Sequence, residues 1–390
     1  MALPLSYNWR NLFVRKLSTT LTFTVIVVVV LVLAVLLSFA AGIRASLAAS
    51  GNPANILVLK PGATAESTSF ILPPEAERVV QTPGIARDDA GQLLISRELC
   101  LQTSIPRKGP KGTMANVPVR GVDEMAFVVH SEVRIIEGRK PVPGALEVVV
   151  GKAAADRYAN LHIGGEISLG RLGNRLCTVV GIFEAGGGSL ESEIWGPRTI
   201  IADSYGRPFS TSVVVRLADP ATAEAAIDYI NGPAVNLEAR RETKYYEELA
   251  AKTREIVGLT TVLVGIMAIG AIFAVANTMY AAVDGRRREI AMLRTIGFPR
   301  RAIMAAFVIE SLLICGIACI VGLLLSLLVS GSRQDFLSDA TWTVLAFELR
   351  ITPGILVSAL LLSLAVGVIG AVAPAVRASR VHVIEALRKA

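Results

Sequence analysis

Long apolar runs dominate the pattern of hydrophobic and polar positions in this 390-residue chain. Four stretches carry almost no charged side chain, at residues 17–43, 256–283, 302–332 and 351–376. Each exceeds the roughly 20 residues that a helix needs to cross a hydrocarbon core about 30 Å thick. The pattern predicts a membrane α-helical protein with four transmembrane helices. The first run is too long for a cleaved signal peptide and is expected to be an uncleaved signal anchor.

The segment between the first two runs has a different pattern, in which short apolar alternations are separated by glycine and proline. Strand, helix and strand are expected in turn near its start, and again near its end, where Asp219 suits a helix N-cap and Pro220 the first helical turn. These elements are predicted at residues 55–60, 73–82, 91–99, 211–217, 219–232 and 234–240. β-Branched runs broken by glycine lie between the two β-α-β units. They predict a mostly β subdomain inserted into an α+β domain.

The stretch that leads into the second apolar run has helical spacing of its own. It contains no glycine or proline before Gly258, and charged and apolar residues alternate so that Tyr245, Leu249 and Lys252 fall near one another. A single helix is therefore expected from the inserted domain through the membrane to about Ala282. Its length would be about 60 Å at 1.5 Å per residue.

Composition and charge then give the orientation. Hydrophobic residues make up 53% of the chain, the mean hydropathy is +0.56 and the formal net charge is +7. The positive surplus lies in residues 1–16, 284–301 and 377–390, with net charges of +3, +4 and +3, whereas residues 43–255 carry −1. Four spans place the three basic segments on one side, and the positive-inside rule makes that side the cytoplasm. Both termini are therefore expected inside.

These patterns predict segments that lie alternately on the two sides of the membrane and within it. The expected segments are a cytoplasmic tail at 1–16, the first transmembrane helix at 17–43, a periplasmic core domain at 44–240 with the inserted subdomain at about 104–208, a stalk with the second transmembrane helix at 241–283, a cytoplasmic loop at 284–301, the third transmembrane helix at 302–332, a short periplasmic loop at 333–350, the fourth transmembrane helix at 351–376 and a cytoplasmic tail at 377–390.

The sequence offers little catalytic chemistry. Its three histidines have no metal-ligand spacing, and no hydrolase or metalloprotease motif occurs. Gly186 to Gly188 open no helix with Lys-Ser/Thr, which disfavours a phosphate loop. Cys100 and Cys177 are open to two interpretations, a disulfide or two small buried apolar side chains. A single aromatic residue, Phe298, lies among the arginines of residues 286–301, so a nucleic-acid surface with interleaved aromatic side chains is not expected.

The cytoplasmic loop contains "RRREIAMLRTIGFPRR" at 286–301, with six arginines. On a helical wheel Ile290, Met292, Leu293, Ile296 and Gly297 share one arc, with Arg287 and Arg294 opposite. Glu289 lies inside the apolar arc, where contact with acyl chains would be costly. We therefore favour a helix that docks in a protein groove over one that lies on lipid headgroups, the alternative for a basic amphipathic helix.

Glu310 is the one ionisable residue within a span. Such residues face a bundle interior, and Arg300, Arg301 or a neighbouring helix could supply the partner. In the fourth span Gly367, Gly370 and Ala373 have spacing that suits close helix packing, including packing in a dimer.

Five features together resemble the MacB/FtsX/LolC-LolE superfamily of ABC-transporter permeases. They are the order of one span, a large outer domain and three spans; "GRRREIAMLRTIGFPRRAI"; Glu310 in "VIESLLI"; the passage "VVVGKAAADRYANLHIGGEISLGRLGNRLCTVVGIFE"; and the tail "APAVRASRVHVIEALR". The resemblance covers essentially the whole chain and implies a MacB-like periplasmic core domain.

The resemblance also implies a function, in which an ATPase moves a coupling helix and the motion reaches the periplasmic domain. It assigns to that helix Arg288, Glu289, Ile290, Leu293, Arg294, Ile296 and Gly297, with Glu310 as the intramembrane polar residue. The chain has no Walker A motif and no LSGGQ-like signature. We therefore expect a non-catalytic permease subunit that binds no cofactor, with ATP-Mg on a separate ABC ATPase.

Partners and substrate are expected by the same resemblance. They are a second permease subunit in a homodimer, membrane lipids, and a periplasmic adaptor with an outer-membrane channel for export or efflux. Two alternatives stay open. One is FtsX-like signalling that activates a cell-wall hydrolase, and the other is LolC/LolE-like extraction of lipoprotein or lipid.

Overall fold

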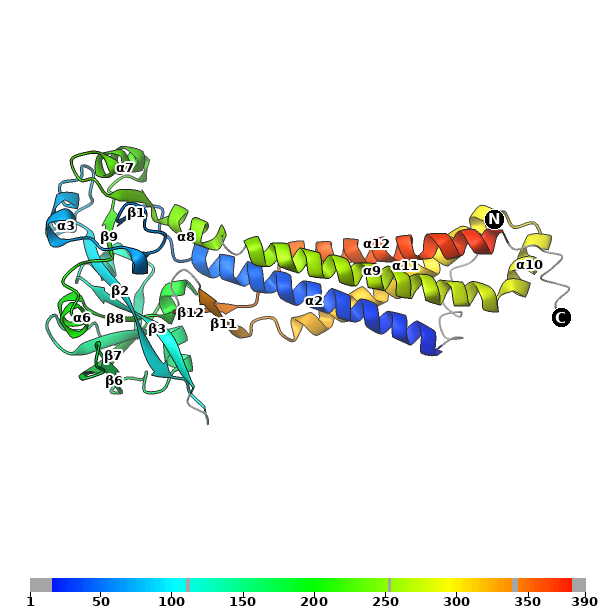
Figure 1. Cartoon of the computed structure of the whole chain (residues 1–390), viewed down its shortest axis with the longest axis horizontal. Helices are drawn as coiled ribbons and strands as arrows, with labels where there is room; N and C mark the ends of the chain where they lie inside the picture. The colour runs from blue at the N-terminus through cyan, green and yellow to red at the C-terminus, as the bar shows by residue number, and fades with distance from the viewer. Residues whose placement is uncertain (1–15, 110–112, 252–253, 339–342, 381–390) are drawn as a thin grey trace. The chain divides into compact units, whose positions relative to one another are not determined.

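A computed structural model describes residues 16–109, 113–251, 254–338 and 343–380 (Figure 1). The chain divides into two compact units. One is helical and comprises Met1–Ala41, Arg254–Ser332 and Leu349–Ala390; the other contains the β-sheet and comprises Gly42–Thr253 and Arg333–Glu348.

The helical unit contains four helices that are long and apolar enough to cross a membrane. They are α2 (Lys16–Ala48), α9 (Arg254–Gly285), α11 (Arg300–Leu327) and α12 (Pro353–Ser379), and the short α10 (Arg287–Thr295) follows α9. Figure 1 shows the long helices side by side. Their lengths exceed the roughly 20 residues of a span, as the apolar runs predicted.

Small residues let these helices approach closely. A Cβ on Gly322 of α11 would lie 3.0 Å from Val30 Cβ of α2, and one on Gly370 of α12 would lie 2.8 Å from Val275 of α9. Gly367 likewise faces Cys315, at 3.0 Å from its Sγ. The glycines of the fourth span therefore pack within the chain, which is one of the two roles that their spacing suggested.

The second unit is built on one ten-stranded sheet in the order β10-β1-β9-β2-β3-β8-β5-β7-β4, with β6 paired to β7. Its strands are β1 (Asn55–Leu59), β2 (Ile95–Pro106), β3 (Met114–Val122), β4 (Arg134–Gly138), β5 (Glu147–Gly151), β6 (Glu166–Leu169), β7 (Arg175–Glu184), β8 (Ile194–Pro197), β9 (Ser212–Arg216) and β10 (Glu238–Arg241). Its helices are η1 (Glu66–Thr68), α3 (Pro73–Val79), α4 (Ala126–Val129), α5 (Lys152–Arg157), η2 (Ser189–Ser192), α6 (Arg198–Tyr205), η3 (Pro220–Thr222), α7 (Ala223–Asn231) and α8 (Glu242–Ala251).

The two expected β-α-β units are interlocked. β1 and β2 flank β9, and β9 and β10 flank β1, with every neighbouring pair antiparallel. Each unit thus leaves a gap that a strand from the other end of the segment fills. The predicted cap is also present, since Asp219 Oδ1 accepts a hydrogen bond from Ala221 N–H at 2.9 Å.

The sheet carries separate apolar clusters along its length. Ile56, Val213 and Val235 belong to the cluster built around the interlocked strands, whereas Leu99, Val117 and Ile194 belong to the next. Cys177 lies in that second cluster, and Cys100 and Cys177 are free thiols in the structure. Two interpretations were open for these cysteines, a disulfide or small buried apolar side chains, and the second describes Cys177.

The segment 333–350, expected to be a short loop, instead forms a hairpin of β11 (Arg333–Ser338) and β12 (Thr343–Glu348). β12 runs beside the end of α2, where a Cβ on Gly42 would lie 2.3 Å from the Glu348 carbonyl oxygen. Only glycine permits this approach. The hairpin was not predicted, because its sequence carries no glycine turn between the strands.

The predicted stalk appears as α8 followed by α9. Residues 252 and 253, which would join the two in one continuous helix, lie outside the described residues.

Candidate functional site

The predicted coupling helix is α10, a separate helix with defined ends. It begins after Gly285 and Arg286 and ends in a Schellman arrangement, in which Gly297 N–H donates to Arg294 O at 3.2 Å and Phe298 N–H to Leu293 O at 3.1 Å. Gly297 has φ +104°, a conformation that favours glycine. Pro299 then precedes α11 at Arg300, so the Gly-Phe-Pro break separates two helices as predicted.

The structure divides the predicted apolar arc between two faces. Ile290 and Ala291 are buried in the helical unit, whereas Met292 and Ile296 are 51% and 75% exposed. Glu289 is exposed on the same side as Met292 and Ile296. One face of α10 therefore anchors the helix, and the other presents two large apolar side chains beside a carboxylate.

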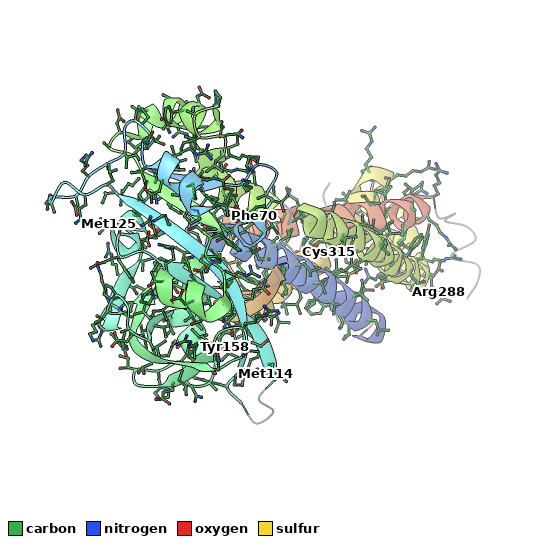
Figure 2. The ribbon with its side chains drawn as sticks, turned by 60° about the vertical axis from the view of Figure 1, so that its left-hand side comes forward. Phe70, Met114, Met125, Tyr158, Arg288 and Cys315 are labelled. Atoms are coloured by element: carbon green, nitrogen blue, oxygen red, sulfur yellow. The ribbon has the colours of Figure 1, made fainter. Side chains whose placement is uncertain are left out.

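The other predicted residues of α10 lie between its buried face and its exposed face or on the exposed side. Leu293 and Arg294 are half-buried, and Arg288 is exposed on the outer surface at this end of the bundle (Figure 2). Arg294 was placed opposite the apolar arc, but its Nη1 donates to the carbonyl of Ser379 at the end of α12, at 3.3 Å. It thus belongs to the anchoring face.

Glu310 is buried, and its partner is Arg286. Nη1 and Nη2 of Arg286 donate to the two carboxylate oxygens at 2.9 and 3.0 Å. The expectation that Arg300 or Arg301 would pair with Glu310 is not met by any ion pair of the described residues, and both are exposed. Arg286 can reach because the chain turns between α9 and α10, beside α11.

The β-sheet unit holds a buried charge network that the sequence did not reveal. All five N–H groups of Arg120 on β3 are used by three carboxylates, at 2.6 to 3.0 Å. The carboxylates are Glu66 of η1, Glu98 of β2 and Glu193 before β8. Trp195 Nε1 and Ser212 Oγ also donate into the network, each at 2.7 Å. Such satisfaction is what makes buried charges tolerable.

The network continues to the first residue of α8. His130 Nε2 lies 2.8 Å from Glu98 Oε1, and its Nδ1 lies 3.7 Å from Glu242 Oε1. Glu242 Oε2 accepts hydrogen bonds from Asn52 N–H at 3.0 Å and Asn55 Nδ2 at 2.9 Å. The start of the stalk is thus fixed to the connection between α2 and β1.

Burial and charge set the protonation of these groups. Burial alone would lower the pKa of His130, but Glu98 and the other nearby carboxylates raise it well above its usual range. Burial alone would raise the pKa of Glu98, but the charges of His130 and Arg120 hold it at about 2. For Glu242 burial wins over His130 and its hydrogen-bond donors, and its pKa is raised to about 7.

The end of α2 is held to the same unit. Ser189 N–H donates to Ser50 Oγ at 2.7 Å, and the two hydroxyl oxygens lie 2.8 Å apart. On the other side, Glu66 N–H donates to Tyr245 Oη of α8 at 3.2 Å. Both helical segments that lead out of the unit are therefore attached to its buried core through specific hydrogen bonds.

These hydrogen bonds attach α8 and the residues after α2 to the sheet. A cavity of about 40 Å³ lies beside Arg120 and is lined in part by Glu66, Glu193 and Tyr245. The described residues contain no group of three or more His, Cys, Asp or Glu side chains placed to hold a metal ion. A charged residue within a β-branched run, as in "NVPVRGV" around Arg120, is the one local signal that could have pointed to the network.

Comparison with known proteins adds family information. The model described as "FtsX-like permease C-terminal" matches residues 261–383, and that described as "MacB-like periplasmic core domain" matches residues 19–232. A macrolide export ATP-binding/permease protein MacB of Neisseria gonorrhoeae is 26% identical over 325 residues, which cover 77% of this chain and 48% of the relative. One from Aeromonas hydrophila is 27% identical over 309 residues, 74% and 46% of the two chains. This chain spans about half the length of the curated relatives it matches.

Solved structures were also compared. The periplasmic region of MacB from Actinobacillus actinomycetemcomitans has a TM-score of 0.38 at 10% identity, with 51% of this chain and 93% of that chain covered. The extracellular domain of the noncanonic ABC-type transporter YknZ from Gram-positive bacteria has a TM-score of 0.35 at 14% identity, with 48% and 99% covered.

Proposed function

This chain belongs to the family of permeases that combine a MacB-like periplasmic core domain with an FtsX-like C-terminal region, and on this premise we propose that it is the permease subunit of an ATP-driven ABC transporter. In this function α10 is the element that an ATPase engages. The chain itself contributes no catalytic group, and ATP-Mg binds to the ATPase.

The observation that carries the proposal is the two-sided character of α10. Its inner face is fixed by Ile290 and by the Arg294 contact with Ser379, while Glu289, Met292 and Ile296 face outward. An apolar pair beside a carboxylate suits a protein groove that has its own hydrogen-bond donors. Contact with lipid would place the charge of Glu289 against acyl chains, and free solvent would leave Met292 and Ile296 exposed.

Charge supports the orientation that this function requires. The basic segments 1–16, 284–301 and 377–390 would lie in the cytoplasm, where α10 meets the ATPase, and the β-sheet unit in the periplasm. The membrane would be the bacterial inner membrane, with both termini inside.

The partners follow from the family. An ABC ATPase supplies the motion, and two permease subunits act together. The curated relatives are named as macrolide export proteins, and this supports export or extraction of a substrate at the outer face of the inner membrane. A periplasmic adaptor and an outer-membrane channel would complete an export path.

Substitution on the exposed face of α10 tests the proposal. Ile296→Asp and Glu289→Lys should each reduce recovery of the ATPase with the affinity-purified permease by at least tenfold. The first places a charge in an apolar contact, and the second reverses the charge that the groove recognises. Recovery is measured from membranes of the native host, because the ATPase partner is produced there.

The control is Leu172→Asp, a matched change at an apolar side chain that is 83% exposed in the β-sheet unit. It should leave ATPase recovery and membrane insertion unchanged. Recovery of the ATPase at parent level with both α10 variants would contradict the docking role.

A further inference from the structure

The junction between α9 and α10 is joined to α11 by a bidentate ion pair between Arg286 and the buried Glu310. Arg286 donates to Glu310 through both terminal nitrogens, and Glu310 is only 4% exposed. A bidentate guanidinium–carboxylate contact fixes orientation as well as separation. Rotation or translation of the junction therefore has to move α11 or break two charge-assisted hydrogen bonds in a buried site.

The place of Glu310 on α11 makes this contact mechanically useful. Glu310 lies about 15 Å along the helix from its start at Arg300, at 1.5 Å per residue. The polypeptide path from α10 to α11 passes through the Gly297 turn instead, at the very end of α11. The ion pair thus acts well inside the helix, where a force displaces the body of α11 and not only its first turn.

The residues beyond Glu310 connect α11 to α12. Ser311 Oγ donates to the Gly367 carbonyl at 2.8 Å, and Ser363 Oγ donates to the Cys315 carbonyl at 2.7 Å. These bonds cross between the helices in both directions, at the position where Gly367 lets them approach. Cys315 lies among the helices in Figure 2. A displacement of α11 at Glu310 therefore has a hydrogen-bonded route to α12.

The next arginine along the chain shows what a surface pair looks like. Arg287 pairs with Asp284 three residues before it, at 2.7 Å, and both side chains are about half exposed. A solvated pair of this kind contributes little and does not reach α11, although Asp284 also lies 3.6 Å from Arg377 of α12. Its chemistry matches that of the Arg286–Glu310 pair, but its burial and reach do not.

We propose that Arg286 and Glu310 form a positioning pair that passes displacement of the coupling helix α10 to the third span. A proton or a lysine would be enough to neutralise the buried Glu310 carboxylate. The bidentate guanidinium of Arg286 in addition fixes the orientation of α10, which carries the exposed docking face, relative to α11. The inference rests on the proposed function, because it takes α10 as the element that the ATPase moves.

The test separates ATPase binding from transmission of its motion. Cysteines at Leu259 and Leu328, both exposed on the helical unit, carry spin labels in a background with the four native cysteines replaced by alanine. The interlabel distance is measured in the permease–ATPase complex recovered from native membranes, with and without a non-hydrolysable ATP analogue and Mg²⁺. The parent complex should show a nucleotide-dependent shift.

Four variants make the result specific. Glu310→Gln should abolish the shift while ATPase recovery stays within a small margin of the parent, although the unpaired Arg286 lowers the thermal midpoint. Arg286→Lys should reduce the shift, because lysine cannot form the bidentate contact. The double variant Arg286→Glu with Glu310→Arg should restore the shift. Arg287→Gln removes the same charge one residue away and should leave the shift intact.

The outcomes are distinguishable. A full shift in Glu310→Gln, or a well-folded double variant without a shift, would overturn the positioning role and leave the proposed function standing. Loss of ATPase recovery from Glu310→Gln would also overturn it, because the pair would then shape the docking face. A parent that recovers no ATPase would remove the proposed function and, with it, this inference.

Discussion

At the scale of single residues, the charges that matter most are buried. Arg120 donates to three carboxylates and Arg286 donates to Glu310, and these hydrogen bonds are 3.0 Å or shorter. Removing one partner from such a site leaves an unpaired buried charge, which costs several times more than the pair contributes. These residues therefore fix local geometry more than they add net stability.

Glu242 provides a pH test of the buried network. Its pKa is raised from 4.5 to about 7, so the folded protein keeps a proton that the unfolded chain loses between these values. The contribution of Glu242 to the free energy of unfolding is fully present below pH 4.5 and is lost as pH rises through 7, a decrease of about 3 kcal/mol. Glu242→Gln retains an oxygen acceptor for Asn52 and Asn55, and should raise the thermal midpoint at pH 8 relative to the parent but not at pH 4.5.

Intrinsic tryptophan fluorescence follows this change, because Trp195 is buried beside the network. The full chain in detergent is heated at both pH values. The matched control is Glu247→Gln on the exposed side of the same helix, which should leave the midpoints unchanged. Parallel pH curves for parent and Glu242→Gln would contradict the role of Glu242.

The pKa of Glu98 is shifted in the opposite direction and affects stability in a different pH range. Because its pKa is lowered to about 2, Glu98 contributes stability above pH 4.5 that is lost as pH falls toward 2.

At the scale of elements, close packing at small residues determines how near the helices of the helical unit approach one another. Gly370 has Val275 of α9 where its Cβ would be, whereas Gly316 of α11 has no atom within 4 Å of that position. Gly370→Leu should therefore force α9 and α12 apart and destabilise the protein by about 1–3 kcal/mol, as overpacking does. Gly316→Leu is the matched control. Thermal unfolding in detergent measures both, and equal midpoints would argue against the packing role of Gly370.

The sequence predicted elements well and their faces less well. The absence of charge was enough to locate the four apolar helices, and Asp219 with Pro220 located a helix start, because both signals are local. The faces of α10 depend on Arg286 reaching Glu310 and Arg294 reaching Ser379, 24 and 85 residues away. A helical wheel holds no information about such partners, so it put Ile290 on the same face as Ile296.

The same limit explains why the charge network was missed. Arg120 is 54, 22 and 73 residues from Glu66, Glu98 and Glu193. Each looks like an ordinary surface charge in its own stretch of sequence. Their meeting is a product of strand order, which places β2, β3 and β8 side by side.

At the scale of the whole molecule, the compartments assigned to its parts can be tested directly. In the cysteine-free background, Leu172→Cys should react with a membrane-impermeant thiol reagent in intact spheroplasts, because residue 172 is highly exposed in the β-sheet unit. Ile296→Cys should react only after lysis. Reaction of Ile296→Cys in intact spheroplasts would reverse the proposed orientation.

The interlocked strands also impose an order on biosynthesis. β1 lies between β9 and β10, whose register partners are 155 to 185 positions further along the chain, as in the pairs Val58 with Val213 and Ile56 with Arg241. As the chain emerges, β1 has an open edge on both sides until nearly all of the segment before α9 has been synthesised. Pairing at such sequence separation is slow. The sheet is therefore completed only after the strands next to α9 have been made, and until then the open edges of β1 expose the nascent protein to aggregation.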